Sequence, residues 1–201
     1  MSVPTPEPSD KALAARAAAG DDSAFEALVE RYQRRVYRLA CRLTSDTDAP
    51  DVLQETFLQV YRHLRSFRGE SQFGTWLYRI ASNAALMHRR AQTRRPTASL
   101  EGFLPRFDAR GLHAATPAEL QIAARADELL DRRFLAEKAR EAVAQLPDLY
   151  RHAFVMRDLE EMSTADVAQV LGVDPATVRQ RVHRARLMLR GCLSDLVGVK
   201  P

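Results

Sequence analysis

The chain has 201 residues, 46% of them hydrophobic and 28% charged, which is enough for one medium domain or two small ones with buried cores. No apolar run approaches the roughly 20 residues of a membrane-spanning helix, and the first ten residues lack the apolar segment of a secretory signal. We therefore expect a cytoplasmic protein without membrane insertion. Two cysteines are too few for a four-ligand zinc site, and no metal-ligand cluster or glycine-rich phosphate loop is present, so we expect no metal, no cofactor and no catalysis.

The basic residues are almost all arginine, and charges of one sign are grouped along the chain. Of 30 basic residues, 27 are arginine, a choice that suits phosphate and base-edge contacts and that a GC-rich coding sequence also produces. Residues 46–55 contain four acids and no base. Residues 88–95 contain four arginines and no acid, and residues 175–191 contain five arginines and no acid. Such segregation predicts separate faces for different partners.

Apolar residues recur at helical spacing in three successive segments of the first half of the chain. The first stripe runs from Phe25 to Leu43, the second from Leu53 to Leu64 with Tyr61 on it, and the third from Phe73 to Ala84. Asp48 is predicted to cap the second helix with its side chain. The three stripes predict a compact all-α unit.

A stretch without periodicity follows, broken repeatedly by proline and glycine between Pro96 and Thr116. It is predicted to be a flexible linker that spans at most about 70 Å. A long helical pattern then runs from Thr116 to Leu146 and is stopped by Pro147, and a shorter one covers residues 149–159. The predicted organisation is two helical domains on a tether: a disordered tail, residues 1–10; a first domain, 11–95; a linker, 96–116; and a second domain, 117–201.

The C-terminal part carries the pattern of a helix-turn-helix. Ser163 or Thr164 can cap a short helix, Gly172 supplies the turn, and Asp174 followed by Pro175 begins the next helix. That helix has an apolar back and a front of arginine, glutamine and histidine, which suits the DNA major groove. A merely solvated face is the alternative, but such faces normally mix signs, and this one has no acid.

Two further segments of the first domain carry polar and aromatic groups. Residues 48–57 present acids and an amide on an otherwise apolar helix, which suits docking of a basic partner, although a capped, solvated helix is the simpler interpretation. Residues 67–77 combine a flexible loop with aromatic rings beside a basic helix, an arrangement that can stack an extruded base. Phe73 and Trp76 lie on the apolar stripe, however, so burial in the core also explains them.

Three blocks in this order resemble the sigma-70 superfamily of bacterial transcription initiation factors, specifically the extracytoplasmic-function (ECF) group and its sigma-E-like members. The blocks are Asp48-x-x-Asp51-x-x-Gln54-Glu55-x-Phe57; Phe67-Arg68-Gly69 with Phe73-x-x-Trp76-Leu77-x-x-Ile80-Ala81-x-Asn83; and Leu146-Pro147 with the helix of residues 178–186. The resemblance covers about residues 11–195. It implies an all-α protein with a sigma region 2 domain and a helix-turn-helix region 4 domain joined by a flexible linker.

The resemblance also implies a function and its residues. An ECF sigma factor binds core RNA polymerase, recognises the −35 and −10 promoter elements, assists promoter melting and directs transcription initiation. Its partners would be the β′ clamp helices, the β flap, promoter DNA and a cognate anti-sigma factor. The implied polymerase contacts are Asp48, Asp51, Gln54 and Glu55. The implied −10 contacts are Gln59, His63, Phe67, Arg68, Ser71, Ile80, Asn83, Arg89 and Arg90. In the −35 helix, bases would be read by Arg179, Gln180, His183 and Arg184, and the DNA backbone held by Thr177 and Arg181.

Two other functions stay open from the residues alone. A self-sufficient helix-turn-helix repressor or activator would dimerise and bind duplex DNA tightly without polymerase, but it leaves the blocks at 48–57 and 67–83 unexplained. A sigma-like decoy or adaptor would bind polymerase without supporting initiation.

Overall fold

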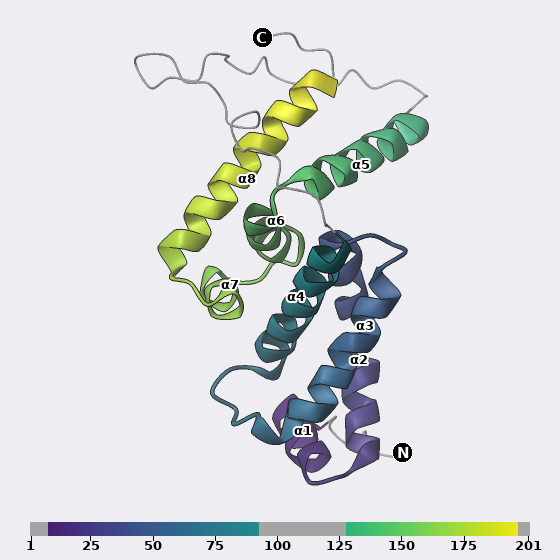
Figure 1. The fold of residues 1–201 in the computed structure, drawn as a ribbon, viewed down its shortest axis with the longest axis vertical. Coiled ribbons are helices and arrows are strands. Elements are labelled where there is room, and N and C mark those ends of the chain that lie inside the picture. The colour runs from purple at the N-terminus through teal and green to yellow at the C-terminus, as the bar shows by residue number, and fades with distance from the viewer. Residues whose placement is uncertain (1–7, 93–127, 197–201) are drawn as a thin grey trace, which may run out of the picture.

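The structure, a computed structural model, describes residues 8–92 and 128–196, and every regular element within these ranges is a helix (Figure 1). The predicted all-α class with two helical domains is confirmed. The N-terminal unit contains α1 (Asp10–Ala18), α2 (Asp22–Leu43), α3 (Ala49–His63), the 3-10 turn η1 (Leu64–Ser66) and α4 (Phe73–Gln92). The C-terminal unit contains α5 (Glu128–Gln145), α6 (Asp148–Phe154), the π-helical η3 (Val155–Leu159), α7 (Thr164–Leu171) and α8 (Pro175–Leu196). The predicted linker and the predicted helix start at Thr116 lie outside the described residues.

Helix α1 is an additional element that the three apolar stripes do not predict. It is rich in alanine, and Leu13 is its one large buried side chain, so its apolar spacing is weak. Ser9 caps it, and its first residue, Asp10, ties it to α2 by accepting hydrogen bonds from Arg31 and from the Tyr32 hydroxyl, both at 2.5 Å. The first helix therefore begins inside the stretch predicted to be a tail.

The predicted side-chain cap at Asp48 is wrong, although α3 does begin directly after that residue. The backbone of Asp48 is helical (φ −91°, ψ −20°) rather than extended, which turns its carboxylate away from the first amides of α3. The carboxylate instead accepts from the hydroxyl of Ser45 at 2.7 Å and from the amide of Gln92 at 2.9 Å. These two hydrogen bonds, that of Ser45 first, hold the pKa of Asp48 below its ordinary value.

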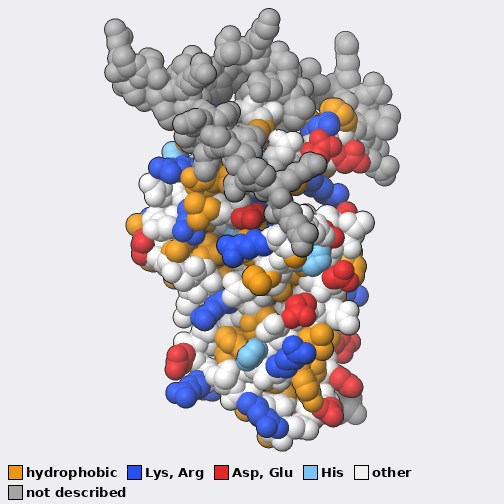
Figure 2. Space-filling view, in the orientation of Figure 1, with side chains coloured by type: hydrophobic (Ala, Val, Ile, Leu, Met, Phe, Trp, Pro, Cys, Tyr) orange, Lys and Arg blue, Asp and Glu red, His pale blue; other side chains and the backbone are white. Residues whose placement is uncertain are grey.

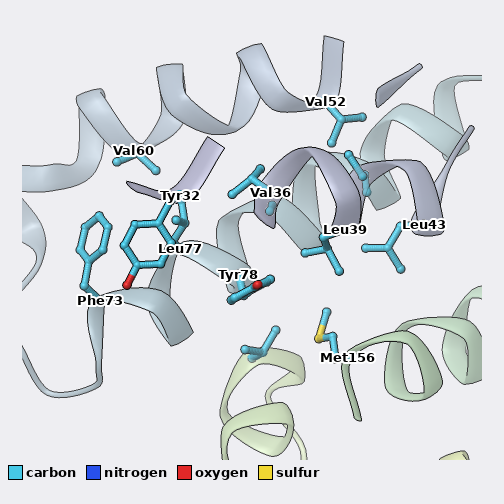
Figure 3. Packing of buried hydrophobic residues seen from close by; sticks show 14 of the residues in the cluster. Tyr32, Val36, Leu39, Leu43, Val52, Val60, Phe73, Leu77, Tyr78 and Met156 are labelled. Atoms are coloured by element: carbon cyan, nitrogen blue, oxygen red, sulfur yellow. The ribbon is translucent and has the colours of Figure 1, made fainter. Parts of the chain in front are cut away.

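The core of the N-terminal unit lies between α2, α3 and α4, as their stripes predict (Figure 3). Val36, Leu39 and Leu43 of α2 are completely buried in it. Tyr61 departs from the prediction, because its side chain is 60% exposed. Its ring packs edge-on against Phe25, with the centroids 5.2 Å apart, at the rim of the core.

The C-terminal unit packs directly onto the N-terminal unit through η3. Val155 and Met156 are completely buried in the same cluster as the N-terminal core, and Figure 3 shows Met156 reaching toward Leu39 and Tyr78. The helix predicted over 149–159 begins at Asp148 and widens into a π turn at Val155. The backbone of Glu160 closes that turn by donating to the Val155 carbonyl at 2.9 Å.

A buried guanidinium lies where α2, α5 and α6 meet. The side chain of Arg151 is almost fully buried, and burial lowers its pKa to about 10, so it stays protonated at neutral pH. It pairs with Asp148 at 3.2 Å. It also donates to four backbone carbonyl oxygens, those of Leu43, Val143, Ala144 and Leu146. One side chain thus supplies hydrogen-bond donors to backbone carbonyl groups that the ends of α5 and α2 leave unpaired.

His152 forms the adjacent polar contact between the two units. Its Nδ1 lies 2.7 Å from the hydroxyl of Ser82 on α4. Its Nε2 is buried, and no partner for it is present among the described residues. Burial lowers the pKa of His152 to about 4; the carboxylate of Asp148 opposes this shift, while Arg151 and Arg89 add to it. The imidazole is therefore neutral at physiological pH.

We predict that this packing weakens as the pH falls from about 6.5 to about 4. Over that range the exposed histidine of an open or unfolded chain takes up a proton while the buried one does not, so the folded state loses stability, up to about 3 kcal/mol from a shift of this size. Urea unfolding across this pH range measures it. His152→Gln keeps a hydrogen-bonding group without the titration, and an equally steep pH dependence in that variant would contradict the assignment.

Candidate nucleic-acid interface

A hollow of about 360 Å³ opens beside the loop between η1 and α4. Its aromatic wall is formed by Phe67 and Trp76, whose ring centroids lie 5.1 Å apart, and the buried Phe73 packs against Phe67 at 5.6 Å. Gly69 adopts a left-handed backbone (φ 74°), which glycine permits, and so lets the loop turn before α4 begins. The hollow is lined by Ser66, Phe67, Arg68, Glu70, Ser71, Thr75, Trp76, Arg79 and Gln169.

The hollow brings together three of the predicted −10 residues, Phe67, Arg68 and Ser71. It adds residues that the sequence interpretation missed. Arg79 follows Thr75 and Trp76 by four and three positions, so helical spacing alone was enough to find it. Gln169 comes from α7, at least 90 positions away in the chain from the other lining residues, and no sequence signal links it to this site.

The other predicted −10 residues do not line the hollow. Asn83 is exposed and continues the row of Arg79 one turn further along α4. His63 is exposed at the end of α3, and Ile80 is half-buried against the core. Gln59 is half-buried and donates to the carboxylate of Glu55 at 2.8 Å.

The two arginines predicted at the end of α4 lie in different surroundings. Arg90 is exposed, whereas Arg89 pairs with Asp148 of the C-terminal unit at 3.1 Å. Figure 2 shows basic side chains interspersed with exposed hydrophobic ones on the part of the surface that the N-terminal unit forms. Arg90 is thus the more exposed of the two, and Arg89 is half-buried by its ion pair.

Helix α3 presents the predicted partner-docking residues unequally. Asp51, Gln54 and Glu55 are exposed, while Asp48 is held by Ser45 and Gln92 as described above. The sequence interpretation missed Leu58, which lies on the same face one turn beyond Gln54 and is 44% exposed. Leu58 adds one apolar side chain to this otherwise polar face.

The helix-turn-helix forms as predicted, with each boundary fixed by the expected residue. Ser163 caps α7 by accepting from the Asp166 amide at 3.0 Å, and Gly172 ends α7 with a left-handed backbone (φ 64°). Asp174 caps α8 by accepting from the Thr177 amide at 2.8 Å and from the Thr177 hydroxyl at 2.6 Å. These hydrogen bonds hold the pKa of Asp174 below its ordinary value.

The front of α8 carries the predicted base-reading residues on its surface. Arg179, Gln180, His183 and Arg184 are all exposed, and the back of the helix buries Val178, Val182, Ala185 and Leu189. Arg184 donates to the Tyr150 hydroxyl at 3.3 Å. Farther along α8, Arg186 forms a bidentate ion pair with the carboxylate of Asp158, with N···O distances of 2.7 and 2.8 Å. This pair raises the pKa of the arginine.

Arg181 is half-buried, and Thr177 has committed both its amide and its hydroxyl hydrogen to the cap. A contact between the Thr177 hydroxyl and a phosphate would therefore require it to release Asp174.

Across 8–92 and 128–196, no three His, Cys, Asp or Glu side chains gather as metal ligands would. Within the same ranges, none of the helices combines the length and the apolar character needed to cross a membrane.

An aromatic hollow flanked by arginines and a helix-turn-helix with an acid-free front, carried on two helical units, together define a DNA-binding transcription factor. Comparisons with known proteins narrow this class. The family model described as Sigma-70 region 2 matches residues 28–95, and the one described as Sigma-70, region 4 matches residues 136–189. The chain belongs to the ECF sigma factors of the sigma-70 superfamily, as its relatives show.

Among these relatives, the ECF RNA polymerase sigma-E factor of Haemophilus influenzae is 39% identical over 193 residues, which cover 94% of this chain and 97% of that protein. The sigma-E factor of Escherichia coli K12 is 36% identical over 192 residues, covering 94% and 96%. The solved structure of CnrH in complex with the cytosolic domain of CnrY is similar with a TM-score of 0.65 at 26% identity, over 92% of this chain and 97% of that one.

We predict that the cap at Asp174 sets the stability of the recognition helix. Asp174→Ala leaves two donors of the first turn without their acceptor and is expected to destabilise the protein by about 1 kcal/mol, measured by thermal or urea unfolding. Asp174→Asn keeps an acceptor of the same shape and serves as the control. An alanine variant as stable as the asparagine one would contradict the role of the cap.

Proposed function

We propose that this protein is a dissociable sigma subunit that binds core RNA polymerase, recognises the −35 and −10 promoter elements, assists strand opening and so directs transcription initiation. The observation that carries the proposal is that one chain contains two features. The first is an aromatic hollow beside the polar side chains of Arg79 and Asn83 on α4, and the second is the exposed front of helix α8. A repressor needs only the second of these features. The family membership established above supports the same function.

The hollow is the proposed site for a base flipped from the −10 element. Flipping costs a few kcal/mol of unstacking, and stacking on an aromatic ring returns about 1–3 kcal/mol per base. Phe67 and Trp76 supply ring surface, and Asn83, which lies outside the hollow one helical turn beyond Arg79, would supply an amide for the base edge. Arg68 and Arg79 lie at the same opening and would hold the flanking phosphates. The remaining −10 contacts that we propose are Gln59, His63, Ser71, Ile80, Arg89 and Arg90.

Helix α8 is the proposed reader of the −35 element. Arginine forks onto guanine and glutamine onto adenine in the major groove, so we assign base contacts to Arg179, Gln180, His183 and Arg184. Arg181 would hold the DNA backbone from its half-buried position. Thr177 would join it only after releasing Asp174. The two readers need not bind tightly alone, because polymerase would hold both at high effective concentration.

We propose the α3 face as the contact with the β′ clamp helices of core polymerase. Asp51, Gln54 and Glu55 supply the polar groups, and Leu58 supplies the apolar centre that a stable protein interface needs. Asp48 would contact polymerase from the edge of this face. The β flap would contact the C-terminal unit. The proposed site of action is the bacterial cytoplasm, where polymerase and promoter meet.

A cognate anti-sigma factor is a further proposed partner. CnrH, which covers nearly the whole of this chain in the structural comparison, was solved with the cytosolic domain of CnrY. A protein segment that engages both helical units would exclude polymerase from the α3 face and DNA from α8 at once.

Reconstitution with bacterial core polymerase and a randomised promoter library tests the proposed function. We expect the transcripts to enrich a two-part motif with a fixed spacing. Polymerase binding without transcription would favour the decoy instead. Failure to bind polymerase, combined with tight binding of duplex DNA by a dimer, would favour the repressor.

We predict that Phe67→Ala combined with Asn83→Ala separates polymerase binding from promoter melting. Loss of the stacking ring and of the amide is expected to reduce open-complex formation at least about tenfold while affinity for polymerase is retained. Permanganate footprinting measures melting, and co-purification measures polymerase binding. Phe134→Ala with Gln33→Ala removes an exposed ring and an exposed amide elsewhere and is the matched control. Unchanged melting in the Phe67/Asn83 variant would contradict the pocket.

A further inference from the structure

One arginine of the recognition helix is already bound by an acid from another element. Arg186 donates from Nε and Nη2 to the two carboxylate oxygens of Asp158, at 2.7 and 2.8 Å. Asp158 belongs to η3 and precedes Arg186 by 28 positions. Residues 175–191 contain no acid of their own, so this carboxylate reaches the basic face of α8 through the tertiary fold.

Arg186 lies on the same side of α8 as two of the proposed base readers. It follows His183 by three positions and Arg179 by seven, and residues at these spacings line one face of an α-helix. Its side chain is 61% exposed. By residue type and position alone, Arg186 would therefore extend the DNA-binding surface of α8 by about one helical turn.

The ion pair has the geometry of one that persists at a protein surface. Most exposed ion pairs contribute little, because both partners return to water at small cost. This pair is bidentate, which fixes both groups in one plane, and the side chain of Asp158 is only 16% exposed. If Arg186 turned outward to a phosphate, the largely buried carboxylate would lose these two donors, and that loss costs free energy.

The pairing distinguishes Arg186 from the arginines nearer the start of α8. DNA attracts a protein through the cations that displace counterions from its phosphates, whatever the base sequence. Arg179 is exposed, and Arg184 donates to the neutral hydroxyl of Tyr150 at 3.3 Å, so neither contact cancels a charge. The charge of Arg186, in contrast, is balanced by a carboxylate 2.7 Å away.

We propose that Asp158 withholds Arg186 from DNA, so that the DNA-binding surface of α8 ends near Arg184 and attracts duplex DNA of any sequence less strongly than its arginines alone would. The proposal rests on the proposed function for DNA binding by α8. Weak sequence-independent attraction suits a reader that polymerase holds at the promoter, because such a reader does not need tight binding of its own.

Asp158→Asn tests the proposal because it keeps the shape of the side chain and removes the charge that holds Arg186. One more neutralised phosphate steepens the fall of log K with log salt by about 0.9, which makes binding about fivefold tighter at about 0.15 M salt. Fluorescence anisotropy measures both quantities, with the full-length protein and a labelled duplex of mixed sequence. Circular dichroism shows whether the variant is folded.

Glu161→Gln is the matched control, since it removes one negative charge of the same unit from an exposed position outside the pair. Screening confines the effect of a single distant charge, so this variant is expected to change duplex binding by less than about twofold. An equal gain in the Glu161→Gln and Asp158→Asn proteins overturns the proposal, because it would reflect net charge alone.

Asp158→Asn combined with Arg186→Ala removes both members of the pair and is expected to match the affinity and salt dependence of the wild type. A double variant that binds about fivefold more weakly overturns the proposal, because Arg186 would then contact DNA from within the pair. Unchanged binding in the folded Asp158→Asn protein overturns it as well. The double variant leaves no unpaired charge in the site and carries the test if Asp158→Asn alone does not fold.

Arg179→Ala separates this proposal from the proposed function. It is expected to weaken binding of the same duplex about fivefold, since it removes one exposed cation of the reader. A weakened Arg179→Ala protein beside an unchanged Asp158→Asn protein overturns the role of Asp158 alone. An Arg179→Ala protein that binds as tightly as the wild type overturns DNA binding by α8, and both proposals with it.

Discussion

One buried cation holds the C-terminal unit together at the place where it meets the N-terminal unit. Arg151 lies where the end of α5, the start of α6 and the end of α2 converge, and it satisfies carbonyls that the helix ends leave unpaired. A guanidinium suits this role because its five donors are fixed in a plane and it keeps its charge even when burial lowers its pKa. Removing it would leave buried carbonyl groups without donors, which costs more than the hydrogen bonds themselves contribute.

The interface around this cation combines an apolar and a polar part with different consequences. Met156 is buried in the N-terminal core and is the apolar part of the contact. The polar part consists of the hydrogen bond between Ser82 and His152 and of the ion pairs that Glu160 makes with Arg38 and Arg42. Apolar burial alone favours association without fixing geometry, whereas hydrogen bonds fix geometry and are exchanged for water on opening.

Most of the helices and the whole helix-turn-helix were predictable because their signals are local. The caps at Ser163 and Asp174 and the turn at Gly172 each depend on a residue and its near neighbours. Asp48 fits the same local rule yet does not cap, since Ser45 and Gln92 compete for its carboxylate and Gln92 comes from another helix. Tyr61 has core spacing yet lies at the rim, and the alanine-rich α1 has too weak a stripe to be seen.

The sequence by itself determined the helical class, the order of the two units, the family and the exposed front of α8, because all of these follow from residue type and spacing along one helix. Only the tertiary structure decided that the units pack together, that Glu160 is buried among donors from α2 and α4, and that Gln169 borders the hollow of Phe67. These features join side chains far apart in the chain. Their energies arise from desolvation and contact across the interface, which no local pattern records.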